Sequence, residues 1–197
     1  MMARLDDAAL DTLFREARTY NGYTADPVSE AEIRAIWDLM KMGPTSANQL
    51  PARLVWCVSD DAKQRLADCC SAQNRPKVLA APVSVVIGMD LDFHEYLPEL
   101  FPHADAKSWF DGNEDLRKES AFRNSSLQGA YLIMAARGLG LDTGPMSGFD
   151  ADKVNAAFFA DTPRVRVNFI STLGHGDPAT IFDRSPRPEF AKFNSIA

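Results

Sequence analysis

Residues 138–150 read Gly-Leu-Gly-Leu-Asp-Thr-Gly-Pro-Met-Ser-Gly-Phe-Asp, a long run of small residues and turn formers. Gly144 and Gly148 free the backbone there, so that exposed N–H groups can meet an acceptor atom of a ligand. Taken alone, the segment is better explained as an ordinary turn. Its role therefore has to be inferred from its neighbours in the sequence.

A helix is expected directly before this segment, over residues 118–139. Its apolar residues are spread nearly all round, which is typical of a helix buried in the middle of a domain. A second helix over 150–159 and a strand over 165–174 are expected after the segment. Because Gly138-Leu-Gly140 closes a helix and does not open one, the pattern argues against a Rossmann-type dinucleotide site.

The first half of the chain adds further helices and two buried strands. Ser29-Glu-Ala-Glu32 is a capping box, and the helix behind it is expected to stop at Gly43-Pro44. The other expected elements are a helix over 6–18, a strand over 54–58, a helix over 60–71, a strand over 82–88, and a long excursion with a few helical turns over 89–117. This order of elements predicts one α+β domain spanning residues 1–197.

The composition is that of an ordinary globular protein, with 46% hydrophobic and 24% charged residues. The formal net charge is −6 and no basic patch is visible, so nucleic acids and anionic membranes are not expected as partners. The sequence contains no apolar run of about 18 residues, the length needed to span a bilayer, and the N-terminus lacks a signal-peptide layout. Three cysteines without disulfide or metal spacing agree with the cytoplasm as the expected location.

Conventional catalytic sets are missing from the sequence. His94, His103 and His175 are too widely separated to form the clustered ligands of a zinc site, so no metal is expected. There is no G-x-S-x-G, H-E-x-x-H or Walker motif either. The sequence thus offers no conventional catalytic side chain.

Two kinds of loop remain as candidate binding segments. Gly43-Pro-Thr-Ser-Ala-Asn-Gln49 offers hydroxyls, an amide and small residues to a flat ligand, although a helix-ending turn explains it better when it is taken alone. Arg18-Thr19 and Arg184-Ser-Pro-Arg187 lie near opposite ends of the chain, and the planar fork of arginine suits phosphate. Each arginine taken singly is more simply a solvated surface residue.

Together, three segments resemble the nitroreductase family. They are Ala17-Arg-Thr-Tyr-Asn21, Gly43-Pro-Thr-Ser-Ala-Asn48 and the run 138–150, in the order in which the family carries them, and the resemblance covers nearly the whole chain. The malonic semialdehyde reductase branch is the most similar. The resemblance implies a nitroreductase-like fold with a mixed central sheet flanked by helices. It also implies a flavin mononucleotide (FMN) held without a covalent bond at the interface of an intertwined homodimer.

The resemblance further implies which residues bind FMN. A segment that contacts the phosphate and the ring is matched by Arg18, Thr19 and Asn21, and a C-terminal basic pair that meets the phosphate is matched by Arg184 and Arg187. The flavin-contacting loop, which the family supplies from the partner subunit, is matched by Thr45, Ser46, Ala47 and Asn48. The stretch against the ring, where a backbone N–H commonly meets flavin N5, is matched by Pro145, Met146, Ser147 and Gly148.

Three positions depart from the family pattern. Ala17 stands where an arginine is usual, Asn21 replaces a basic residue, and Ser147 occupies a position where glutamate is frequent. The site therefore carries fewer charges near the ring than the family pattern does. This favours a small, specific electron acceptor over the broad range of a general nitroreductase.

The function implied by the resemblance is ping-pong reduction on FMN with NADH or NADPH, malonic semialdehyde being converted to 3-hydroxypropionate. The alternatives are a broad reductase of nitroaromatics, quinones or enones on the same fold, and a flavin-binding protein without a reductase role. An unrelated helical interaction protein would need the arginine loops to be mere surface. The aromatic segment Phe93–Phe110 is interpreted either as a lid over the substrate or as an arm at the dimer interface.

Overall fold

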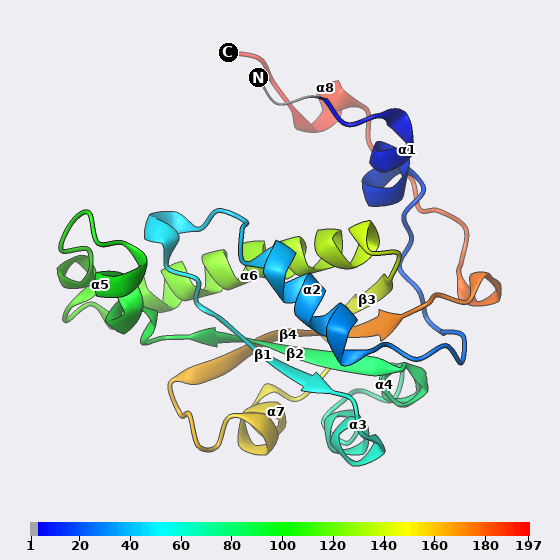
Figure 1. Cartoon of the computed structure of the whole chain (residues 1–197), viewed down its shortest axis with the longest axis horizontal. Helices are drawn as coiled ribbons and strands as arrows, with labels where there is room; N and C mark the ends of the chain where they lie inside the picture. The colour runs from blue at the N-terminus through cyan, green and yellow to red at the C-terminus, as the bar shows by residue number, and fades with distance from the viewer. Residues whose placement is uncertain (1–3) are drawn as a thin grey trace.

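The computed structural model describes residues 4–197, so the first three residues of the expected domain lie outside it. Its centre is a sheet of four strands in the order β1-β2-β4-β3 (Figure 1). The strands are β1 (Ala52–Cys57), β2 (Val83–Asp90), β3 (Asp142–Met146) and β4 (Val165–Gly174). The α+β class is confirmed, but the expectation of a mixed sheet is wrong: each neighbouring pair is antiparallel, and parallel pairing appears as an isolated bridge between Thr19 and Thr143.

Helices cover both faces of the sheet (Figure 1). On one face lie α2 (Glu30–Met40) and α6 (Glu114–Gly138), and on the other lie α3 (Asp60–Ala67), α4 (Arg75–Ala80) and α7 (Ala151–Phe158). The remaining helical elements are short: α1 (Asp7–Leu10), η1 (Asp11–Arg15), η2 (Ser46–Asn48), η3 (Phe93–Tyr96), α5 (Leu97–Leu100), η4 (Lys107–Phe110), η5 (Pro178–Thr180) and α8 (Phe190–Phe193). Within residues 4–197, no helix is both long enough and apolar enough to cross a lipid bilayer.

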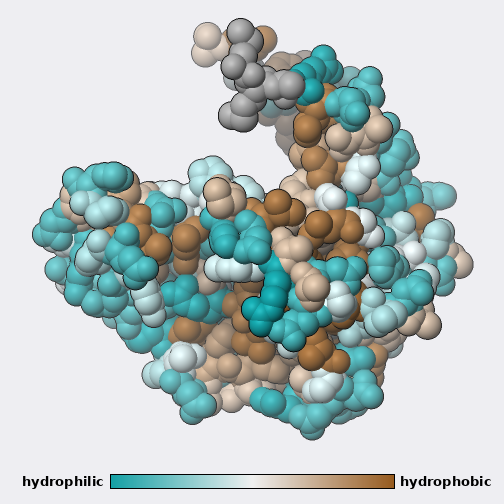
Figure 2. Space-filling model, in the orientation of Figure 1, coloured by the Kyte–Doolittle hydropathy of each residue, from teal (hydrophilic) through white to brown (hydrophobic). Residues whose placement is uncertain are grey.

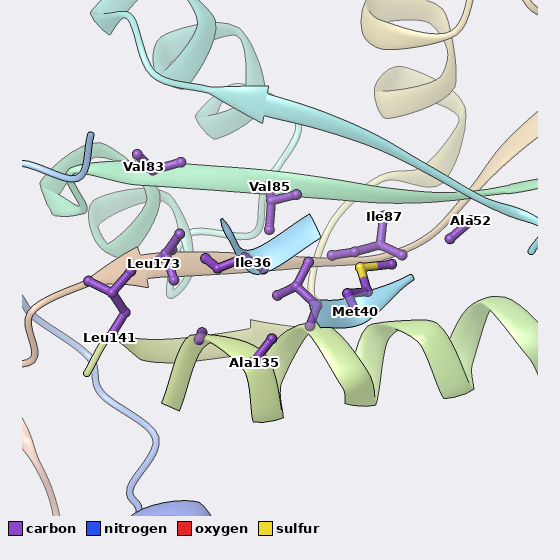
Figure 3. Packing of buried hydrophobic residues seen from close by; sticks show 11 residues of the cluster. Ile36, Met40, Ala52, Val83, Val85, Ile87, Ala135, Leu141 and Leu173 are labelled. Atoms are coloured by element: carbon purple, nitrogen blue, oxygen red, sulfur yellow. The ribbon is translucent and has the colours of Figure 1, made fainter. Parts of the chain in front are cut away.

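The main core lies between the sheet and the pair α2 and α6 (Figure 3). Ile36 and Met40 of α2 pack with Val85 and Ile87 of β2, and all four side chains are fully buried. Leu132 joins this cluster from α6, but α6 is not buried all round as its apolar pattern predicts, because Phe122 and Leu127 are 55% and 41% exposed. The α2 helix begins at the predicted capping box.

The opposite face of the sheet carries a second core. Side chains alternate along a strand, so Val86 of β2 points away from the first core and packs with Leu66 of α3 and Val154 of α7. Cys57 lies in the same cluster, and burial raises the pKa of its thiol to about 11. A thiol with so high a pKa is protonated at neutral pH, which lowers its reactivity as a nucleophile.

Two elements differ most from the expectations. Residues 142–146 form β3, although Gly144 and Pro145 indicated a turn; β3 is an edge strand, where proline is tolerated because no ladder hydrogen bond is lost on the open side. The helix expected over 60–71 ends at Ala67, and α4 follows it as a separate short helix with Pro76 in its first turn.

Candidate functional site

The two ends of the chain meet in a cleft of about 440 Å³, which we call the arginine cleft. It is lined by Phe14, Ala17, Arg18, Thr19, Asn21, Arg137, Phe182, Asp183, Arg184, Ser185 and Arg187. Arg18 donates a hydrogen bond to the carbonyl of Phe182, and Arg184 donates to the carbonyl of Ala17 at 3.2 Å. The five predicted site residues near the two termini are thus brought into one cleft.

The cleft concentrates positive charge in a chain whose formal net charge is −6. Four arginines line it, against the single carboxylate of Asp183. Burial lowers the pKa of Arg137 and the charge of Arg184 lowers it further, while Asp142 acts in the opposite direction. Guanidinium groups crowded in this way bind a phosphate through paired, charge-assisted hydrogen bonds.

Arg137 was not predicted to belong to this site. It stands in the last turn of α6 and donates to the carbonyl of Leu13 at 2.7 Å, which ties the N-terminal segment to the end of the helix. The sequence held one signal for it, because Arg137 is a cation next to the glycines that end a largely apolar helix. A cation in that place also compensates the helix dipole, so its position alone did not indicate a ligand.

The open edge of β3 leads away from the arginine cleft. Thr19 bridges Thr143 at the start of β3, and a Cβ added at Gly144 would lie 2.9 Å from the carbonyl oxygen of Tyr20. Glycine is therefore required for the close approach of these two segments. Further along, Pro145 and Ser147, two and four residues after Thr143, are exposed.

Gly148 is held by residues that the sequence did not indicate. Its carbonyl accepts a hydrogen bond from the backbone N–H of Ser71 at 2.9 Å and another from Asn74 Nδ2 at 3.2 Å. A Cβ at Gly148 would lie 2.6 Å from Asn74 Nδ2. An amide side chain therefore stands beside the predicted ring-contacting stretch. The contact links positions 74 residues apart, so no local pattern could reveal it.

The predicted flavin-contacting loop Thr45–Asn48 lies away from both the arginine cleft and the edge of β3. Ser46 N–H donates to Oδ1 of Asn124, which is 13 residues before Arg137 on α6, or roughly 20 Å along the helix axis. Asn48 donates through Nδ2 to the carbonyl of Leu100 at 2.8 Å. A single chain thus joins the arginine cleft to the edge of β3 but does not bring Thr45–Asn48 to them.

The aromatic segment 93–110 packs as a unit of its own at the far end of α6. Phe93, Leu97 and Phe110 are buried in one cluster with Ala121 of α6. Tyr96 and Trp109 from the same segment are about half exposed, at 48% and 54%. The segment contains helical turns, as expected, and presents two large aromatic side chains to a neighbour or a ligand.

Within this segment, the buried His94 is predicted to make stability depend on pH. Burial lowers its pKa and the charge of Arg117, whose Nη1 is 3.0 Å from Nε2, lowers it further, whereas Glu95, Asp92 and Asp111 raise it. The unfolded chain therefore takes up the proton more readily, below a pKa of about 6.5. Stability contributed by neutral His94 is present above that pH and is lost as the pH falls below it.

The matching measurement is urea unfolding of the wild type and of His94→Gln at about pH 7.5 and about pH 5.5, either side of the unfolded-state pKa. We expect the wild type to lose more stability on acidification than the variant does. Equal losses would show that other groups cause the acid sensitivity.

Comparison with known proteins gives a consistent result. The family model described as "Nitroreductase family" matches residues 14–175. A Burkholderia lata protein provisionally named NADH dehydrogenase/NAD(P)H nitroreductase is 59% identical over 189 residues, which cover 96% of each chain. A provisionally named nitroreductase of Bacillus subtilis superposes with a TM-score of 0.86 at 19% identity, over 98% of this chain and 100% of that one. One from Exiguobacterium sibiricum, solved in complex with FMN, gives 0.85 at 19% identity over the whole of both chains. The chain therefore belongs to the nitroreductase family.

Proposed function

We propose that this nitroreductase-family oxidoreductase binds FMN along the path from the arginine cleft to the edge of β3, as one FMN-binding domain. The observation that carries the proposal is the continuity of these two features. Four arginines suit the phosphate, and the exposed residues Pro145 and Ser147 are accessible to a flat ring. A Cβ at position 148 would fill the space beside Asn74, so only glycine lets the backbone come this close to the Asn74 side chain.

In this mechanism the chain binds, orients and tunes the cofactor. Bound FMN would supply the redox chemistry, hydride transfer between NADH or NADPH and an acceptor. Arg18, Arg184 and Arg187 would hold its phosphate, and the backbone N–H groups of Ser147 and Gly148 would donate toward its ring. No side chain at 145–148 titrates near neutral pH, so the proton for the product is expected to come from water.

The proposed acceptor is malonic semialdehyde, reduced to 3-hydroxypropionate. Support comes from the neutral residues Ala17, Asn21 and Ser147, which leave the ring region with few charges, so a small, specific substrate is favoured. Asn21 donates through Nδ2 to the carbonyl of Thr180 at 3.1 Å, which fixes its amide beside the cleft. The acidic chain and its three unpaired thiols fit a reducing compartment, and we propose the cytoplasm as its location.

One assay series tests both the reaction and the acceptor. Purified protein saturated with FMN is mixed with NADH or NADPH and, in parallel, with malonic semialdehyde, a nitroaromatic, a quinone and an enone. We expect the fastest oxidation with the semialdehyde. Faster turnover of the other acceptors would support the broad reductase, and a yellow protein that oxidises no NAD(P)H would support a flavin-binding role alone. A preparation that stays colourless after incubation with FMN would contradict the flavin proposal altogether.

We also propose an intertwined homodimer, in which a second copy supplies the segment Thr45–Asn48 that one chain leaves about 20 Å from the arginine cleft. The two terminal segments support this, because they project together from the body as an arm (Figures 1 and 2). Large apolar side chains on the C-terminal part are exposed, at 80% for Phe182, 70% for Phe193 and 90% for Ile196. Such an apolar arm is typical of an interface. Sedimentation of the holoprotein as one chain would contradict the dimer.

A further inference from the structure

The segment that enters β1 has an unusual backbone. Ala47, Asn48 and Leu50 have φ angles of 48°, 49° and 40°, in the left-handed region that residues other than glycine rarely adopt. Leu50 is bulky, so its conformation is especially unfavourable. Such residues persist only where the surrounding structure over-determines them. Specific contacts must therefore hold this loop in its conformation.

One face of α6 supplies those contacts as a ladder of polar side chains. Asn124 Oδ1 accepts from the N–H of Ser46 at 2.9 Å, and Ser120 exchanges hydrogen bonds with the side chain of Gln49 at 3.0 and 3.1 Å. Gln128 Oε1 accepts from the N–H of Ala52 at 2.8 Å. Residues four apart lie on one helix face, so 120, 124 and 128 form a row beneath residues 46–52.

All three rungs of the ladder are buried, with exposures of 7% for Ser120, 2% for Asn124 and 0% for Gln128. Buried polar groups with complete partners rigidify a structure, and removing one partner is costly. Asn124 is complete in this sense, because its Nδ2 donates to the carbonyl of Ser120 at 2.9 Å. It is also the rung that holds Ser46, directly before the left-handed residues Ala47 and Asn48.

We propose that Asn124 is a positioning residue for the flavin-contacting loop Thr45–Asn48, which it fixes by accepting the N–H of Ser46. This inference rests on the proposed function, since it takes the loop as an FMN contact. Asn124 itself does not touch the cofactor. It acts by keeping the loop in its left-handed conformation before the ligand binds. Binding then does not require the loop to lose conformational entropy.

The loop has other contacts besides Asn124: the N–H of Asn48 donates to the carbonyl of Thr45 at 3.0 Å, and Ala47 packs against the cluster that contains Phe93. Thr45 Oγ1 accepts from the N–H of Leu50 at 3.3 Å, a contact within the loop itself. Asn48 is exposed and reaches the carbonyl of Leu100, which belongs to the aromatic segment 93–110. The loop is thus fixed from below by Asn124 and from the side by α5. Without the hydrogen bond to Asn124, we expect the loop Thr45–Asn48 to move together with the aromatic segment.

The test compares Asn124→Leu with Gln128→Leu as the matched control. Both substitutions remove a buried amide from the same helix face, but the control frees the N–H of Ala52, which lies beyond the loop. We expect Asn124→Leu to raise the Kd for FMN about tenfold, the effect of one lost buried hydrogen bond, and Gln128→Leu to leave it within about threefold. If Asn124→Leu does not fold, Asn124→Ala replaces it.

Hydrogen exchange of the flavin-free proteins gives a readout independent of the cofactor. The amides of residues 45–50 should exchange faster in Asn124→Leu than in wild type or Gln128→Leu. A wild type that binds no FMN would overturn the proposed function. A wild type that binds FMN, together with equal affinity and equal loop exchange in Asn124→Leu and its control, would overturn this inference alone.

Discussion

Replacing Arg18 or Arg187 by alanine is expected to raise the Kd for FMN roughly tenfold to a hundredfold, since a hydrogen bond to a charged group contributes about 1.5–3 kcal/mol. Both residues line the arginine cleft, where their guanidinium groups would face the phosphate. Neither removal leaves an apolar core cavity, because both side chains lie at the surface of the cleft. Affinity is measured by the quenching of FMN fluorescence on titration of the flavin-free protein.

The control for these variants is Arg34→Ala. Arg34 is an arginine on α2 whose side chain is 74% exposed and paired with Glu30, remote from the cleft. Its loss removes the same charge from the protein and should leave the Kd for FMN unchanged within about twofold, as expected of an exposed ion pair. Wild-type affinity in both Arg18→Ala and Arg187→Ala would contradict the assignment of the cleft to the phosphate. A loss in Arg34→Ala as large as in the cleft variants would show that net charge, not the cleft, controls binding.

Local signals account for the parts of the fold that the sequence predicted. The capping box at Ser29 satisfies backbone N–H groups that no helical carbonyl can reach, so it marks the start of α2 regardless of the rest of the chain. The apolar residues of α6 predicted a long helix but not its one-sided burial, since Phe122 and Leu127 are exposed. The start of α6 at Glu114 was placed four residues late, because its capping by Asn113 lies inside the irregular region 89–117.

The misjudged parts depend on contacts between distant residues. β3 contains glycine and proline, which are poor strand formers, and it is held as an edge strand by pairing with β4. Asn74 reaches Gly148 only because α4 folds against the end of β3. Arg137 enters the arginine cleft through the packing of α6 against the N-terminal segment. These residues carry no spacing signal, whereas the arginines of the two termini were found through their resemblance to a known pattern.

Phe93→Ala is expected to be the most destabilising single substitution considered for this chain, at about 3–5 kcal/mol, the usual cost of deleting a buried phenylalanine ring. The Phe93 side chain is fully buried, and its ring meets that of Phe110 edge to face with centroids 4.9 Å apart. Leu97 and Ala121 pack in the same cluster, so the resulting cavity is bordered by α5 and α6 together. Urea unfolding of the flavin-free proteins at one concentration measures the effect without the stabilisation that bound FMN and subunit association add.

Tyr96→Ala is the matched control, because it removes an aromatic ring from the same segment at a position that is 48% exposed. Its ring lies 5.0 Å from the guanidinium of Arg53, and loss of that contact should cost about 1 kcal/mol or less. A large effect of Phe93→Ala with a small effect of Tyr96→Ala would show that segment 93–110 unfolds together with the sheet. A loss below about 1 kcal/mol for Phe93→Ala would instead mean that the segment opens on its own, well below the global free energy of unfolding. Such an independent opening is what a movable lid over a binding site requires, whereas an arm anchored at the dimer interface is expected to unfold with the body of the protein.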